Sequence, residues 1–492
     1  MFNNLAPELK IAIAHHVRRP VTNGFRPGER PQADVRSLSL TSKAWSTAAQ
    51  VALFQRVEVK SAIQIQKFRK TLETFPSLVD YVAEVHFGDQ SHVSQDLEVL
   101  DLEDIVEITA LLPNLSEVGI HNFYVKDLPE DSEPSSASVI ATRRQINVLE
   151  MTTILIPPNV LTILLRHLST CSLRMSAMHI LVDDSEVDAD SAMAWAADTV
   201  SWSTVRRLVI DELTADLWDG LDDTLHEVSI LEPFMHGTLE SLRMPKCPLV
   251  QADETQGLTA LAAILKDGVG INLRELELNL CRPDDYFGVS DTEDAGSDVF
   301  GPISRSMTPI TLKTCCPRLT SLIISVPLFG GVDPCSTEKL PEWRYALRLI
   351  TSSNLASLTR ITIYVTCRLS QLKNVDFAVS DTLLGALNWT HLDEVLSRYP
   401  NLEPVEFRGR FGSECGFRSQ TRNPAPEATI PRSFRLDSYL EEKMPALATR
   451  GILYVGPFTD PYEGMLYEEY WADYSQMLHD TYGSDDEDGT IE

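Results

Sequence analysis

The sequence is poor in cysteine and in basic residues, and each shortage argues against a class of protein. Only 8 cysteines are spread over 492 residues, whereas small secreted domains held by disulfides are dense in cysteine. Lys and Arg number 42 against 71 Asp and Glu, which gives a formal net charge of -29. Nucleic acids and anionic lipids both require a basic surface. We therefore expect neither a nucleic-acid partner nor a membrane partner.

Long apolar runs are also missing. No uninterrupted apolar stretch reaches the roughly 20 residues that a transmembrane helix needs. The opening MFNNLAPELK has no basic region followed by an apolar run, as a secretory signal would. With so little cysteine, these features predict a soluble protein of a reducing compartment, in the cytoplasm, the nucleus or both.

Motifs that carry catalysis or bind cofactors are absent from the sequence. There is no GxSxG elbow, phosphate-binding GxxxxGK[ST] loop, HExxH, CxxC, or GxGxxG opening a helix. Cys315 and Cys316 are adjacent, which favours a buried pair before a strand over a metal site. We expect no catalytic residues, no cofactor and no metal. An enzyme remains an alternative, because catalytic residues converge in space and not in sequence.

A short pattern recurs along the chain: apolar, two residues, apolar, one residue, apolar. In LRELELNLC (273–281) and LESLRMPKC (239–247) it ends in Cys281 and Cys247, at a position that leucine-rich repeats fill with Asn or Cys. Each copy predicts a short strand whose apolar side chains point inward. The copies are 82–87, 115–120, 175–180, 205–210, 225–230, 239–244, 273–278, 319–324, 358–363 and 402–407.

Helical stretches alternate with these strands. One strand and one helix cannot bury their apolar faces alone, so such units must stack. The spacing of the copies is irregular, which predicts a degenerate solenoid resembling leucine-rich repeats over residues 58–456. The expected fold class is α/β, with parallel strands inside and helices outside. The predicted helices are 62–75, 97–112, 158–170, 257–267, 340–353, 381–399 and 436–449.

Three polar segments interrupt the solenoid. Residues 128–138 and 282–302 are acidic and rich in turn formers, whereas 407–435 is rich in arginine. Guanidinium groups bind carboxylates and phosphates through pairs of hydrogen bonds. The arginines of this segment would therefore let it bind an acidic or phosphorylated substrate. An ordinary surface loop, neutralised by the acidic body, is the alternative. The candidate substrate-binding residues are Arg408, Arg410, Arg418 and Arg422.

The last segment, 457–492, contains no Lys or Arg. Tyr and Trp at helical spacing in its first half predict an amphipathic helix that caps the solenoid. From residue 483 the acidic run predicts a disordered, solvated tail.

The first 57 residues predict a small helical module. In LAPELKIAIAHHV, the apolar residues Leu5, Leu9 and Ile13 recur at i, i+4 spacing, and Pro7 stands in the first helical turn. In DVRSLSLTSKAWSTAAQVALFQRVEV a second stripe begins with Leu38 and includes Trp45. Together these segments resemble the F-box, in the form seen in fungal proteins. The resemblance implies that a Skp-family adaptor is bound by Leu5, Pro7, Leu9, Ile13, Leu38, Leu40 and Trp45.

The resemblance implies a substrate-recognition subunit of an SCF-type ubiquitin ligase. Its partners would be the Skp-family adaptor, through it a cullin, and an unidentified target protein bound by the solenoid. Such a subunit brings the target near the ubiquitin-charged enzyme and does no chemistry itself. A different interpretation stays open. In it, the N-terminal helices cap the solenoid of an interaction scaffold that works without a ligase.

Overall fold

The computed structural model divides the chain into two compact units, Met1–Trp195 and Ala196–Glu492, and each is described by itself. The described residues are 10, 43–88, 97–126, 143–180, 203–211, 213–215, 231, 234, 237–245, 256–280, 311–327, 341–354, 356–367, 389–411 and 436–456.

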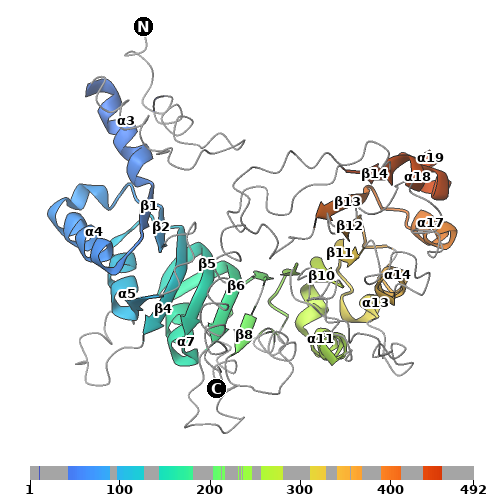
Figure 1. Ribbon diagram of the computed structural model, residues 1–492, viewed down its shortest axis with the longest axis horizontal. Helices are drawn as coiled ribbons and strands as arrows, with labels where there is room; N and C mark the ends of the chain where they lie inside the picture. The colour runs from blue at the N-terminus through green and yellow to red at the C-terminus, as the bar shows by residue number, and fades with distance from the viewer. Residues whose placement is uncertain are drawn as a thin grey trace, which may run out of the picture. The chain divides into compact units, whose positions relative to one another are not determined.

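The first unit is a parallel sheet, and helices lie in several of the segments that connect its strands along the chain (Figure 1). Its strand order is β1-β2-β4-β5-β6, with β3 pairing β4, and each of these pairings is parallel. The strands are β1 (Arg56–Val59), β2 (Glu84–Phe87), β3 (Glu98–Asp101), β4 (Glu117–Lys126), β5 (Arg144–Ile156) and β6 (Leu168–Ile180). The helices are α3 (Lys43–Phe54), α4 (Ala62–Thr74), the 3₁₀ helix η2 (Pro76–Leu78), α5 (Leu102–Leu111) and α7 (Pro158–His167).

The second unit repeats this plan. Its strand order, β7-β9-β10-β11-β12-β13-β14, follows the chain, and every pairing in it is parallel. The strands are β7 (Arg207–Ile210), β8 (Leu213–Ala215), β9 (Ser241–Met244), β10 (Glu275–Asn279), β11 (Ser321–Pro327), β12 (Arg360–Cys367), β13 (Val405–Phe411) and β14 (Leu453–Val455). The helices are α11 (Gln256–Lys266), η5 (Val269–Asn272), α13 (Leu312–Cys315), α14 (Pro341–Thr351), α17 (Trp389–Ser397), α18 (Leu436–Lys443) and α19 (Pro445–Arg450).

The recurring apolar pattern forms the core of both units. In LRELEL, Leu273, Leu276 and Leu278 are each 0% exposed, and in LEPVEF the corresponding residues are at most 2% exposed. The same three positions are buried in the copies at 82–87, 115–120, 205–210, 239–244, 319–324 and 358–363. The predicted α/β architecture of parallel strands and helices is therefore confirmed. The copy at 225–230 lies outside the described residues.

The copy predicted at 175–180 lies in a strand, β6, but its register is wrong. Met175 pairs with Met151, and Met151 pairs with Ile120, the third apolar position of its own copy. The first position of β6 is therefore Thr170, which is buried and whose hydroxyl donates to main-chain carbonyls. A search that required an apolar residue at that position could not find this register.

The apolar pattern also occurs in two strands that were not among the predicted copies. Strand β5 contains INVLEM (146–151), with Ile146, Leu149 and Met151 all buried. Strand β1 pairs with β2 directly after helix α3, so the boundary predicted at residue 57 falls within a strand of the sheet.

The predicted helices are present among the described residues, with shifted ends. The one expected over 97–112 begins only at Leu102, because 98–101 form strand β3. The one expected over 436–449 is broken at Met444, directly before Pro445, into α18 and α19. Proline lacks the amide that a continuous helix would need there.

Asparagine side chains tie successive repeats together. Asn114 donates to the main-chain carbonyl of Asp80 at 2.8 Å, and Asn272 donates to that of Gly237 at 2.6 Å. Asn401 does the same to Ala356 at 2.8 Å. Each Asn directly precedes the first apolar position of its repeat, so each bond links a strand entry to the loop one repeat earlier.

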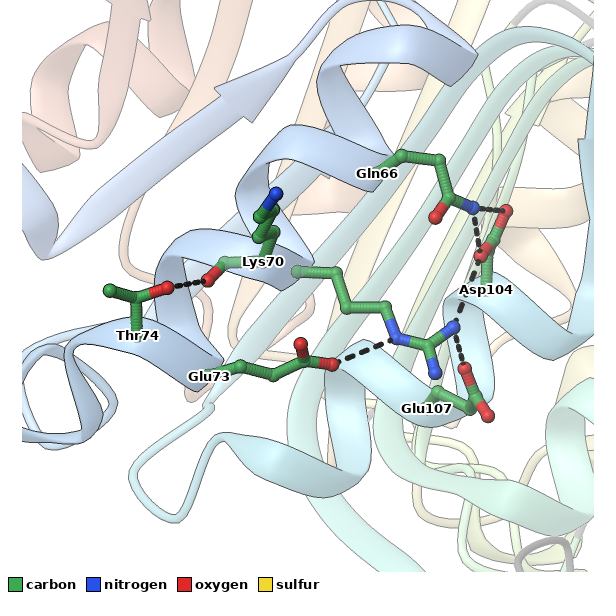
Figure 2. A network of polar contacts seen from close by, with 7 residues as sticks. Gln66, Lys70, Glu73, Thr74, Asp104 and Glu107 are labelled. Carbon is green, nitrogen blue, oxygen red and sulfur yellow. Dashed lines mark hydrogen bonds and ion pairs between the residues drawn. The ribbon is translucent and has the colours of Figure 1, made fainter.

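A polar network on the helical side of the first unit joins α4 to α5 (Figure 2). Arg69 forms ion pairs with Glu107 and, at 4.0 Å, with Asp104, and Gln66 Nε2 donates to Asp104 Oδ1 at 2.8 Å. Burial is the main cause that raises the pKa of both carboxyl groups. The Arg69 guanidinium offsets part of that burial cost.

Among the described residues, no helix has the length and apolar character needed to cross a membrane.

Candidate functional site

The side of the second unit's sheet that faces away from the core carries polar and charged side chains. Residues paired across parallel strands point to the same side of a sheet, and alternate residues point to opposite sides. The register therefore gathers one set of side chains, which we call the polar face. It comprises Arg207, Val209, Ser241, Arg243, Glu275, Glu277, Asn279, Ser321, Ile323, Ser325, Arg360, Thr362, Tyr364, Glu406, Arg408 and Tyr454.

Arg243 and Glu277 form an ion pair at one end of the polar face. Arg243 Nε lies 2.5 Å from Glu277 Oε2 and 3.7 Å from Glu275 Oε1. Burial would lower the pKa of Arg243, but the carboxylate of Glu277 outweighs it, and the pKa is raised. The Glu277 side chain is 0% exposed, whereas that of Arg243 is 40% exposed. The carboxylate thus lies beneath the guanidinium.

A second arginine above a carboxylate lies on β13, four strands from β9. Arg408 Nη2 lies 2.9 Å from Glu406 Oε2, and the Thr362 hydroxyl donates to the same oxygen at 3.3 Å. Glu406 is 15% exposed and Arg408 is 44% exposed. Here too the carboxylate is covered and the arginine reaches solvent. Hydrogen bonds to charged groups are roughly twice as strong as neutral ones, so each carboxylate fixes the guanidinium above it.

Only part of the predicted substrate-binding set can be located. Arg408 lies on the polar face, and Arg410 pairs with Thr366 between β13 and β12. Arg418 and Arg422 lie outside the described residues. The structure thus places Arg408 on the same face of the sheet as Arg243 and Glu277, which the sequence interpretation had not selected. A signal was present, because Arg243, Glu277 and Thr362 each stand between the second and third apolar positions of a copy.

Of the predicted adaptor-binding residues, Trp45 is described. It lies on α3 and is 7% exposed, and Ala49 and Ala52 on the same helix are fully buried. The others lie outside the described residues: Leu5, Pro7, Leu9, Ile13, Leu38 and Leu40.

The first unit holds a buried histidine pair on the corresponding side of its sheet. The rings of His86 and His121 stack with centroids 5.4 Å apart, and His86 Nδ1 lies 3.1 Å from His121 Nε2. Gly119 leaves the space for both rings, because a Cβ there would lie 2.2 Å from His86 Nδ1. Burial, and secondarily Arg56 and His121, lower the pKa of His86 to about 3. His86 is therefore neutral over the physiological range.

Carboxylates surround this pair. Register places Glu58 and Glu150 in the row of His86, with Glu84 and Glu117 one row away. Burial chiefly, and then Glu84 and Glu150, raise the pKa of Glu117. Among the described residues, no group of three or more His, Cys, Asp or Glu is arranged to hold a metal ion.

Cys315 and Cys316 are both buried, at 8% and 0% exposed, directly before the entry to β11. The prediction of a buried pair before a strand is confirmed. Burial raises the pKa of Cys316 to about 12, so it stays a thiol at neutral pH.

Neither a scan against models of known protein families nor a search of curated protein sequences found a match to this chain. The candidate site therefore rests on geometry alone. It is a sheet face on which arginines supported by carboxylates point outward.

Proposed function

We propose that the chain is a substrate-recognition subunit of an SCF-type ubiquitin ligase. Residues 1–57 act as an F-box that binds a Skp-family adaptor, and through it a cullin. A degenerate solenoid resembling leucine-rich repeats binds the target protein. The subunit is not an enzyme and works in the cytoplasm, the nucleus or both. It raises the concentration of target lysines near the ubiquitin-charged enzyme.

The observation that supports this proposal is the one-sided arrangement of the second unit. Its apolar positions face the buried core, while the opposite side of the same strands carries a row of charged and polar groups. Stacked repeats of this kind create extended binding surfaces with few deep pockets. In this proposal the F-box-like residues bind the adaptor, and the polar face binds the target.

A second candidate function is an interaction scaffold that works without a ligase. Helix α3 ends at Phe54, and strand β1 begins at Arg56 and pairs with β2. A helix that leads so directly into the first strand is what a cap on the sheet requires, and Trp45 on it is buried. The two candidates differ in whether the N-terminal segment binds an adaptor.

The test is co-purification of the full chain with the Skp-family adaptor. A Leu9→Asp variant should lose the adaptor, because a carboxylate cannot enter an apolar interface without a large desolvation cost. Ile63→Asp is the matched control, because Ile63 lies on α4 and is 69% exposed. Circular dichroism confirms that both variants fold. If the unaltered, folded chain does not retain the adaptor, the ligase proposal is wrong and the scaffold remains.

A further inference from the structure

We propose that the polar face of the second unit binds an acidic segment of a partner protein. The segment crosses the strands and places two clusters of carboxylates on two pairs of arginines. The inference rests on the proposed function only where it identifies this partner as the target for ubiquitination. The face, its charges and its spacing stand independently of the adaptor.

Most of the exposed charge on the polar face is positive: four arginines stand against one carboxylate, that of Glu275, which is 37% exposed. Arg207 and Arg360 are exposed, and the side chains of Arg243 and Arg408 are 40% and 44% exposed. Beneath them, Glu277 and Glu406 are 0% and 15% exposed. The carboxylates therefore hold the arginines in place while the guanidinium ends meet solvent. In a chain of net charge -29, this basic layer complements an acidic partner.

The arginines fall into two pairs. Arg207 and Arg243 lie on the neighbouring strands β7 and β9, and Arg360 and Arg408 lie on the neighbouring strands β12 and β13. Four strand spacings separate β9 from β13, or about 19 Å at about 4.8 Å each. An extended segment covers that distance in about six residues.

Between the two pairs, Glu275 on β10 lies in the row that holds Arg207 and Arg360, and its side chain is 37% exposed, so it would repel a carboxylate of the partner there. Ser321 and Ile323 on β11 are partly exposed, whereas Ser325 is fully buried, so the middle strand offers one hydroxyl group and one apolar side chain. Glu277, on β10, is fully buried. The partner segment is therefore acidic at its two ends and small or uncharged in its middle.

The corresponding side of the first unit provides a contrast within one chain. Four carboxylates lie there, from Glu58, Glu84, Glu117 and Glu150, against Arg56 and Arg174. Arginines raised above buried carboxylates are thus a feature of the second unit's polar face and not of both sheets. Arg56 and Arg174 serve as matched control positions.

The experiment is fluorescence anisotropy with the full chain and a labelled peptide. The probe has two Glu-Glu pairs separated by about six Gly and Ser residues. We expect binding at about 0.02 M salt that weakens at about 0.15 M. The double variant Arg207→Gln, Arg360→Gln should raise Kd at least about 10-fold, because charge-assisted hydrogen bonds are lost from both ends. The ion pairs with Glu277 and Glu406 are formed by Arg243 and Arg408, which this variant keeps, so the variant should fold.

The control is Arg56→Gln, Arg174→Gln, which makes the same change in net charge and should leave Kd within about twofold. Equal weakening in both double variants would show a generic charge effect and overturn the proposal. The proposal would also be overturned if a probe with adjacent Glu pairs bound as tightly as the probe with spaced pairs. Absence of any binding at low salt has the same consequence.

The chain's own acidic tail is the competing occupant. A full-length variant with Asp485→Asn, Asp486→Asn, Glu487→Gln and Asp488→Asn should bind the probe no more tightly than the unaltered chain. If the probe binds only this variant, the tail occupies the face and the proposal of a partner protein is wrong. The assay contains no adaptor, so loss of adaptor binding leaves this inference intact and loss of probe binding leaves the ligase proposal intact.

Discussion

At the scale of single residues, Gly119 is a position where the structure leaves no room for a side chain. Its added Cβ would lie 2.2 Å from His86 Nδ1 and 2.5 Å from His121 Nε2, and both rings are 1% exposed. We expect Gly119→Ala to lower the free energy of unfolding by about 1–3 kcal/mol, the usual cost of overpacking. Urea unfolding measures this. Gly456→Ala is the control, because its nearest contact would be 3.4 Å away; an equal loss there would refute the steric explanation.

His86 also makes stability depend on pH. Its pKa is about 3 in the folded chain, against 6.5 for an unburied histidine. At pH values between these two pKa values, the unfolded chain binds a proton at His86 that the folded chain does not bind. Stability therefore falls as the pH drops below about 6.5. From pH 7 to pH 5 the loss is about 2 kcal/mol.

The measurement is urea unfolding at pH 7 and pH 5 of the unaltered chain and of His86→Gln. The raised pKa of Glu117 acts in the opposite direction at lower pH, so the difference between the two proteins is the decisive quantity. The variant should lose about 2 kcal/mol less stability on acidification. Equal losses would mean that His86 is protonated at little cost and that its burial is incomplete.

At the scale of elements, charged contacts join α4 to α5. Replacing Arg69 with Met leaves Asp104 and Glu107 without their shared cation, and burial already raises the pKa of both. We expect a loss of about 1 kcal/mol at pH 7, since Arg69 is 35% exposed and partly screened. The loss should shrink as the pH falls and the carboxyl groups become protonated. Lys70→Met, on the exposed side of α4, should cost less than Arg69→Met in the same thermal unfolding series.

At the scale of the whole molecule, the sequence predicts the core better than the binding surface. Apolar positions such as Leu276 and Ile361 repeat a spacing that only a buried strand satisfies, so the parallel strands were predictable. The register of β6 was not, because Thr170 satisfies its hydroxyl with main-chain carbonyls where the pattern expects an apolar residue. The polar face was missed because Arg243 and Arg408 are 165 residues apart in the sequence and share one face of the sheet only through the stacking of strands.

Because consecutive repeats stack on one another, the fold also predicts which strands a destabilising substitution affects. In the second unit each strand of the series pairs only with adjacent repeats, so stability should be a sum of local terms. Leu276 on β10 is 0% exposed, and Leu276→Ala should cost about 2–5 kcal/mol. Hydrogen exchange should accelerate first in β9, β10 and β11, while amides of β4 and β5 in the first unit keep their protection. Ile271→Ala, at a site 54% exposed, should change neither. Equal acceleration in β4 and β5 would show that the two units unfold as one cooperative body.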